Sequence, residues 1–362
     1  LGLSDDERDL INAAVEAKEN NGGKVIVMLN NANAMEIDEI KNNDGVDAIM
    51  EIGFPGGYGF YGVADILSGE ANPSGHLTDT YAVTNANSPA AQNFGNYEWT
   101  NADPSVNINA EEVEAEDIYT GYKYYETRYA DTVLGQGNAD ATVGSSTGKA
   151  WNYDDEVSYP FGYGLSYTTF EQTLKSVDVD LANRTGKDVV QLYTSVPYTD
   201  YDVENKVEKS AVQLLDYEKT DMIEPGESQT VTITADAQDM ASWDSSCENE
   251  AGTTGNWILD NGTYYFTVGN GAHEAVNNVL AAQDQDVEGN KDNVQTWELG
   301  DFDSSSFAVT LNGTPVENQL QDADLNNWME DTVTYLSRND WEGTWPETYK
   351  DLTATDEMIS TM

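Results

Sequence analysis

The sequence EIGFPGGYGFYGVADILSGEANPSGHLTDTY, residues 51–81, decides the fold of the first part of the chain. The two glycines after Pro55 can adopt positive φ angles, so they predict a tight turn in which the backbone passes close to a neighbouring group. Residues 62–67 follow with a short helix pattern that places apolar side chains on one face, and the Asn-Pro-Ser-Gly segment 72–75 ends it. This stretch therefore predicts a glycine-rich turn that leads from a strand into a short helix.

Helix and strand patterns alternate along the residues before this stretch. Ser4 and Glu7 form the capping-box pattern that starts a helix. Residues 24–30 form a continuous apolar run, expected for a strand buried on both faces of a parallel sheet, and residues 46–52 predict a second buried strand. Residues 34–41 predict a helix between the two strands. The alternation predicts a layered α/β domain.

The carboxyl ends of these strands are where such a domain would bind a ligand. They lie at residues 30–33 and 54–58. The glycines of residues 53–59 lack the G-x-G-x-x-G spacing with a distant acidic residue, and no Gly-Lys-Ser/Thr of a P-loop follows them. We therefore do not expect a nucleotide at this turn.

Composition bounds the size of the protein and the class of its partners. A chain of 362 residues predicts two or three domains. With 16 basic and 66 acidic residues the formal charge is −50, which repels nucleic acids and anionic lipids but is compatible with a neutral sugar. Cys247 is the single cysteine, so no intrachain disulfide can form.

The sequence contains no run of 18 apolar residues and no signal-peptide pattern. Because the chain starts at Leu1 rather than at Met and enters a helix at once, we expect residue 1 to lie inside a longer polypeptide. The acidity and the lack of disulfides suit an extracellular or cell-surface bacterial protein, while a cytoplasmic location stays open.

Three blocks of the sequence together resemble one known family. Residues 51–81 form the first block, residues 116–127 read EDIYTGYKYYET, and residues 159–170 read YPFGYGLSYTTF. In this order they resemble the second, α/β sandwich domain of family 3 glycoside hydrolases, which leads into a fibronectin type III-like domain. Residues 318–324 and 334–346 resemble the linker that enters the catalytic (β/α)8 barrel in a subgroup with permuted domain order.

The resemblance implies a fold class and a domain organisation. An α/β sandwich domain with a mostly parallel sheet would span residues 1–165, including a long aromatic loop at about 85–158. An all-β fibronectin type III-like sandwich would follow over residues 166–312. Residues 313–362 would be a linker towards a barrel that this chain does not contain.

The sequence after the third block supports the β domain independently. Turns at the spacing of a β-sandwich separate four strand-like runs. The runs are residues 189–193, 211–215, 229–234 and 263–269. The chain departs from the family between Phe170 and Asp188, where a further strand is usual. Either that strand is missing from the recorded sequence, which we favour, or the sheet is trimmed.

The resemblance also implies a reaction. It is the retaining, exo-acting hydrolysis of terminal β-linked sugars from oligosaccharides or glycosides, as in β-glucosidases, and it needs two carboxyl groups about 5 Å apart. In the family the nucleophile is an Asp of the barrel, expected after Met362, and the acid/base is a Glu expected before Leu1. We therefore expect no catalytic residue in this chain and no activity from it alone. If the aromatic loop supplied the acid/base, Glu114 and Glu116 would be the candidates; otherwise they form a solvated acidic face.

Three aromatic residues are candidates for substrate binding. They are Tyr58, Trp99 and Tyr119, because the apolar face of a pyranose packs on an aromatic ring. The alternative for each of them is an ordinary packing role.

No metal or cofactor is predicted. Residues 284–289 and Asp292 imitate the start of a calcium loop, but its twelfth position is Gln295 instead of a bidentate Glu. His76 and His273 have no partners at metal-ligand or catalytic-triad spacing.

The partners predicted are a glycoside substrate and the barrel domain, without nucleic acid, and a homo-oligomer is left open. A second hypothesis belongs to another class of protein: a non-catalytic carbohydrate-binding or structural cell-surface protein built on the same scaffold.

Overall fold

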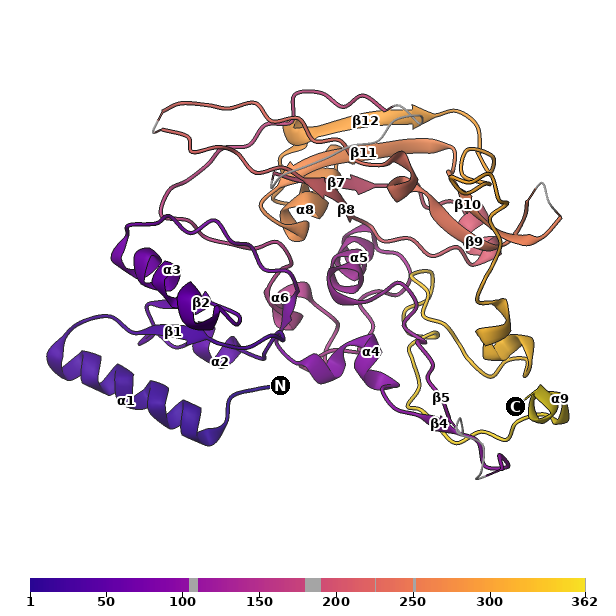
Figure 1. The fold of residues 1–362 in the computed structure, drawn as a ribbon, viewed down its shortest axis with the longest axis horizontal. Coiled ribbons are helices and arrows are strands. Elements are labelled where there is room, and N and C mark those ends of the chain that lie inside the picture. The colour runs from indigo at the N-terminus through magenta and orange to yellow at the C-terminus, as the bar shows by residue number, and fades with distance from the viewer. Residues whose placement is uncertain (104–109, 180–189, 225, 250–251, 362) are drawn as a thin grey trace.

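The structure is a computed structural model that describes residues 1–103, 110–179, 190–224, 226–249 and 252–361. Figure 1 shows an N-terminal region with a parallel pair of strands, a central region around helix α5, and a β-rich region. No helix in these ranges is both long and apolar enough to cross a membrane.

The N-terminal region has the predicted order of elements, with Ser4 and Glu7 forming the capping box of the first helix. Strands β1 and β2 pair in parallel, and Ile26 lies opposite Ala48. The elements are α1 (Asp5–Asn21), β1 (Ile26–Leu29), α2 (Asp38–Lys41), β2 (Ala48–Glu51) and α3 (Gly56–Ser68). The prediction of a helix, strand, helix, strand, turn and helix is confirmed.

Two of these helices have different bounds from those predicted. Helix α2 does not include residues 34–37, because the backbone N–H of Glu36 donates to the carbonyl of Leu1 instead of to a helical partner. Helix α3 begins already within the glycine turn, where Gly56 has a φ of +63°. Of its apolar face, only Val63 is buried.

The prediction that the two strands are buried on both faces is wrong. Leu29 packs into a core with Ile37 and Ile40, but Ile26 and Met28 are 42% and 45% exposed. Ile26 and Met28 alternate with Val27 and Leu29, so they lie on the other face of the sheet, which is only partly covered in the described part of the chain. The sheet has two strands here, so the mostly parallel sheet of the prediction is represented by a single parallel pair.

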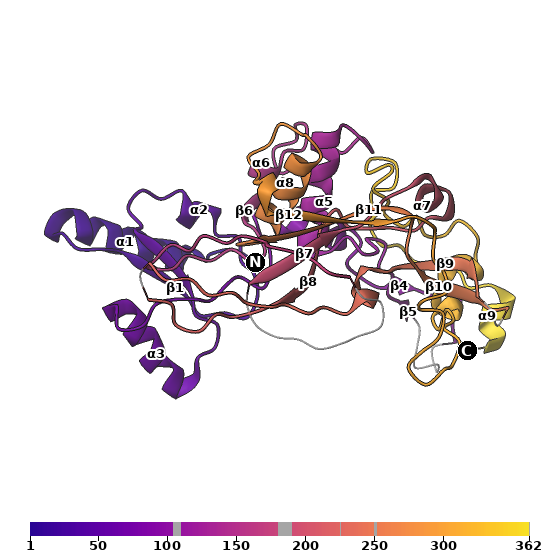
Figure 2. The same ribbon diagram turned by 90° about the horizontal axis from the view of Figure 1, so that it is seen from above.

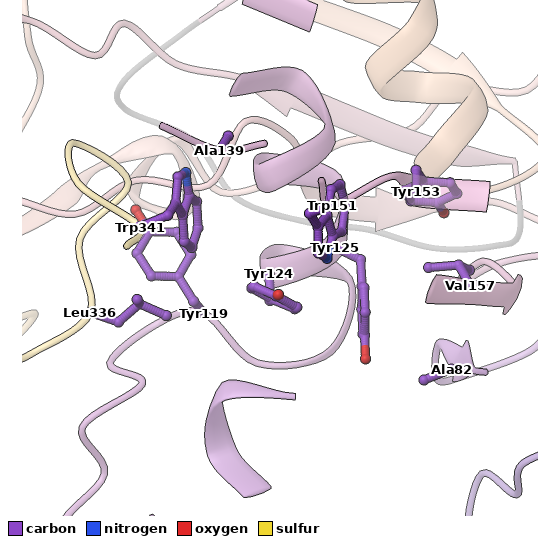
Figure 3. Packing of buried hydrophobic residues seen from close by; sticks show 10 residues of the cluster. All are labelled: Ala82, Tyr119, Tyr124, Tyr125, Ala139, Trp151, Tyr153, Val157, Leu336 and Trp341. Carbon is purple, nitrogen blue, oxygen red and sulfur yellow. The ribbon is translucent and has the colours of Figure 1, made fainter. Parts of the chain in front are cut away.

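The central region is organised around α5 (Gly121–Leu134), which lies within the predicted aromatic loop. Half of its 14 residues are buried, and two of them, Tyr124 and Tyr125, enter the aromatic core of Figure 3. Strand β3 pairs antiparallel with β6, and β4 with β5. The short elements around α5 are β3 (Tyr81–Ala82), α4 (Pro89–Gln92), β4 (Tyr97–Glu98), β5 (Ala110–Glu111), α6 (Tyr153–Glu156) and β6 (Val157–Tyr159).

The β-rich region is built on a four-stranded antiparallel sheet with the strand order β12–β11–β7–β8. Helix α8 and α5 lie on the same side of this sheet (Figure 2), where Tyr193 of β7 joins their core, while the neighbouring Leu192 joins a core on the opposite face. Strands β9 and β10 form a separate pair. The elements are β7 (Gln191–Ser195), α7 (Asp200–Asn205), β8 (Gln213–Tyr217), β9 (Ser242–Glu248), β10 (Thr254–Ile258), β11 (Gly262–Gly269), α8 (Ala272–Ala282) and β12 (Val294–Leu299).

Three of the four predicted strand runs overlap β7, β8 and β11. Residues 229–234 do not form a strand, because no backbone ladder joins them to a neighbour in the described ranges. Of the segment where a family strand was expected to be missing, residues 180–189 lie outside the described residues. Residues 171–179 form no strand, but three of their side chains pack against the sheet: Leu174, Val177 and Val179.

The C-terminal segment, predicted as a linker, packs against the central region. Leu336 and Trp341 are fully buried in the core around α5. Farther along, Leu352 forms a parallel bridge with Trp99, and a short helix, α9 (Asp356–Thr361), follows. The chain therefore returns to its own middle before residue 361.

Candidate functional site

The three aromatic residues predicted to bind substrate lie in different surroundings. Tyr58 on α3 is 89% exposed, whereas Trp99 is 5% exposed within a core that includes Leu352. Tyr119 is fully buried, and its hydroxyl donates to Glu208. The rings of Trp99 and Tyr119 are thus closed to a ligand in this structure, because they pack in cores. The stacking role of Tyr58 stays a prediction.

The two acid/base candidates lie on the loop before α5. Glu114 is exposed, and Glu116 is 8% exposed. Burial raises the pKa of Glu116, and the neighbouring charges of Glu114 and Glu112 raise it further. A carboxyl group in this setting holds a proton more readily than an exposed one does. Its catalytic role stays a prediction.

The core around α5 contains a fully buried arginine. Arg128 donates to the carbonyls of Ala139, Ala141 and Val143 and to the hydroxyl of Tyr124, at 2.8–2.9 Å. Its guanidinium carbon also lies 4.9 Å from the ring centre of Trp151. Arg128 therefore fixes the loop after α5 against the helix, which is a structural role.

A second buried arginine ties the C-terminal segment to α5. Arg338 forms an ion pair with Asp131 and donates to the carbonyl of Lys209. The indole N–H of Trp341 donates to the same Asp131 carboxylate at 3.0 Å. In Figure 3 Trp341 lies beside Tyr119. The two contacts of Asp131 span long sequence separations: Arg338 lies 207 positions after it and Trp341 lies 210 positions after it.

A third buried group joins the central region to the β-rich region. Glu126 on α5 is fully buried and accepts the hydroxyl proton of Tyr153 at 2.6 Å. His273 on α8 places Nδ1 2.9 Å from the other oxygen of Glu126, and its ring stacks on Tyr153 at 4.0 Å between centroids. A carboxylate can only accept, so Nδ1 carries the proton and donates. Burial raises the pKa of Tyr153 well above its ordinary value, and the charge of Glu126 adds to this.

No local sequence pattern indicates this group of Glu126, Tyr153 and His273. The sequence predicts no partner for His273, because its partner Glu126 lies 147 positions away along the chain. Only the docking of α8 on α5 brings the two together.

A cavity of about 780 Å³ opens beside this group. Its lining comes mainly from α5, the segment 151–154, the segment 160–165 and α8. Its lining combines aromatic rings, side-chain amides and carboxylates, and it includes no lysine or arginine. A smaller hollow of about 580 Å³ lies near β4 and the C-terminal segment, lined by Phe94, Tyr349 and three carboxylates.

Metal-ligating side chains are not grouped in the described residues. No three His, Cys, Asp or Glu side chains lie there in an arrangement that could hold an ion. His76, the other predicted lone histidine, has Nδ1 2.6 Å from the carbonyl of Gly162, which connects it to the backbone rather than to a ligand set.

Two family models match the chain. "Glycosyl hydrolase family 3 C-terminal domain" matches residues 1–167, and "Fibronectin type III-like domain" matches residues 188–272. The match of the first model ends near Tyr167, inside the third block of the sequence.

Curated relatives are similar over most of the chain. A β-glucosidase of Ruminococcus albus is 30% identical over 89% of this chain, and β-glucosidase A of Butyrivibrio fibrisolvens is 32% identical over 70% of it. The chain spans only 27% and 29% of the lengths of these two proteins. Among solved structures, β-glucosidase 3B of Thermotoga neapolitana in complex with glucose is similar with a TM-score of 0.54 and 28% identity, covering 83% of this chain and 35% of that one.

Proposed function

Because this chain belongs to glycosyl hydrolase family 3, we propose that it is the part of a β-glucosidase-like enzyme that combines the α/β domain with the fibronectin type III-like domain. The complete enzyme would release terminal β-linked sugars from oligosaccharides or glycosides with retention of configuration. The observation that carries this proposal is the continuous similarity to the Ruminococcus albus β-glucosidase over 89% of the chain.

The contribution of this chain would be to form one wall of the sugar pocket and to hold it in place. Retaining hydrolysis needs a nucleophile and an acid/base about 5 Å apart on either side of the scissile bond. In the complete enzyme, a barrel domain would supply the nucleophile, and the acid/base would come from a part of the enzyme other than these residues. Tyr58, exposed on α3 next to the end of β2, is the aromatic residue of this chain that we propose for contact with the substrate.

Hydrolysis of p-nitrophenyl β-D-glucopyranoside tests the proposal. We expect the 362-residue chain to show no turnover above the uncatalysed rate and the complete native polypeptide to hydrolyse the substrate. Proton NMR should show the β-anomer of glucose as the first product. The intact mass of the native polypeptide, with its terminal peptides sequenced, is the matched control, because it shows whether a barrel is present.

A native mass near 39.7 kDa with no hydrolysis would contradict the proposal. It would favour the non-catalytic carbohydrate-binding or structural protein instead. Release of the α-anomer first would contradict the retaining mechanism alone.

A further inference from the structure

The cavity beside Glu126 and His273 has the size of a small-molecule site. Its volume of about 780 Å³ lies within the range of ligand pockets in proteins, about 300–1,000 Å³. Its walls come from the central region and from α8 of the β-rich region, and the group of Glu126, Tyr153 and His273 joins these walls. Two side chains of the cavity wall, Tyr153 and His273, are therefore held in place by hydrogen bonds to the buried Glu126.

The charge of the lining selects against anions. Asp154, Glu274 and Glu288 are exposed carboxylates on its wall, and the lining contains no lysine or arginine to balance them. In a protein with a formal charge of −50, this negative potential excludes phosphates and carboxylates and admits neutral molecules.

The polar groups on the wall supply both acceptors and donors. Since Nδ1 of His273 donates to Glu126, Nε2 is the ring nitrogen left for another partner, as an acceptor in the neutral ring or a donor in the protonated one. No hydrogen bond to Nε2 is found within the described ranges. Asn152 uses its side-chain oxygen to cap α6, which leaves its amide N–H groups as donors. Sugar hydroxyls, which both donate and accept, fit this mixture.

Aromatic rings complete the lining. Of the four aromatic residues on the wall, Tyr129 and Tyr163 are half-buried, whereas Trp151 and Tyr153 are 2% and 7% exposed and pack in the core behind it. Leu165, 73% exposed, adds an apolar side chain. The C–H face of a pyranose packs on such apolar surfaces while its hydroxyls reach the polar groups at the edge. We infer that this cavity binds a neutral saccharide of one or two sugar rings.

An NMR titration of the isotope-labelled 362-residue chain with cellobiose tests the inference. We follow the indole N–H signal of Trp151, assigned with a Trp151→Phe variant. Saturable shifts with a Kd on the order of 1 mM are expected for a small polar ligand in an open pocket. Sodium glucuronate, which adds a carboxylate to the same kind of ring, should bind more weakly because of the lining charge.

Asp154 and Asp155 provide a matched pair of variants. Both are exposed neighbours, but only Asp154 lines the cavity. Asp154→Ala should raise the Kd for cellobiose about tenfold or more, because a hydrogen bond to a charged group is lost. Asp155→Ala should leave it within about twofold. Glu274→Gln, on a different element of the wall, should also raise the Kd and serves if Asp154→Ala folds poorly.

Several results would overturn the inference. They are the absence of a saturable Trp151 shift up to about 50 mM cellobiose, well above the expected constant; equal effects of the Asp154 and Asp155 variants; and equal binding of glucuronate and cellobiose. A saturable shift with calcium chloride but not with cellobiose would assign the cavity to a cation instead. None of these outcomes depends on glucoside hydrolysis, so the proposed function is tested separately.

Discussion

Replacing Trp341 by alanine tests whether the C-terminal segment is part of the folded core or a loose connection. Trp341 is fully buried, its ring contacts Tyr119 edge-on at 4.9 Å between centroids, and its indole N–H donates to Asp131 at 3.0 Å. Truncating a buried tryptophan to alanine costs about 3–5 kcal/mol, since it removes apolar contacts and leaves a cavity. That is a large fraction of the about 5–15 kcal/mol by which a domain is stable.

The assay is urea denaturation followed by circular dichroism. A Trp341→Phe variant keeps most of the ring but loses the N–H, so we expect a smaller loss of about 1.5–3 kcal/mol for the hydrogen bond to a charged partner. Glu342→Ala is the matched control, because this neighbour is exposed and its backbone N–H bond to Asn138 is retained. Its effect should stay within about 0.5 kcal/mol. A loss below about 1 kcal/mol for Trp341→Ala, against the 3–5 kcal/mol above, would refute the packing of this segment.

Three further predictions follow from other contacts. Asp131→Asn leaves the buried Arg338 without its carboxylate and should cost about 3–5 kcal/mol in urea denaturation; a change near zero would show that this ion pair is not buried in solution. Gly162→Ala should lower the melting temperature, because Gly162 has a φ of +81° and an added Cβ would lie 2.8 Å from the Cα of Gly271, and an unchanged melting temperature would contradict this backbone geometry. Asp47 has a lowered pKa because Lys18, Lys24 and the N–H of Val25 donate to it. Its contribution to stability is present above about pH 4 and is lost as the pH falls further. Asp47→Asn should therefore reduce the fall of the melting temperature with decreasing pH below about pH 4. An unchanged dependence of the melting temperature on pH would argue against these contacts.

Much of the N-terminal fold could be predicted from the sequence because its signals are local. The capping box of Ser4 and Glu7, the apolar run of β1 and the glycine turn at the start of α3 each act within a few residues. The family blocks at residues 116–127 and 159–170 added the identity of the domains, which the family models support. Neither kind of signal depends on how distant segments pack.

Burial is where local reasoning failed. Trp99 and Tyr119 are of the residue type that stacks on sugars, but their rings pack against residues more than 200 positions later in the chain. These residues are Leu352 for Trp99 and Trp341 for Tyr119. Ile26 lies in an apolar run, yet it is 42% exposed, because its face of the sheet is only partly covered in the described part of the chain.

The candidate site shows the same division. The sequence by itself determined the alternating elements of the α/β domain, the strands β7, β8 and β11 of the β region and the strong negative charge, because these follow from residue order and composition. Only the tertiary structure decided that Glu126 meets His273 and that a cavity opens beside them. The physical reason is that a pocket is made by side chains of separate elements, and their meeting depends on the docking of α8 against α5, which no local pattern encodes.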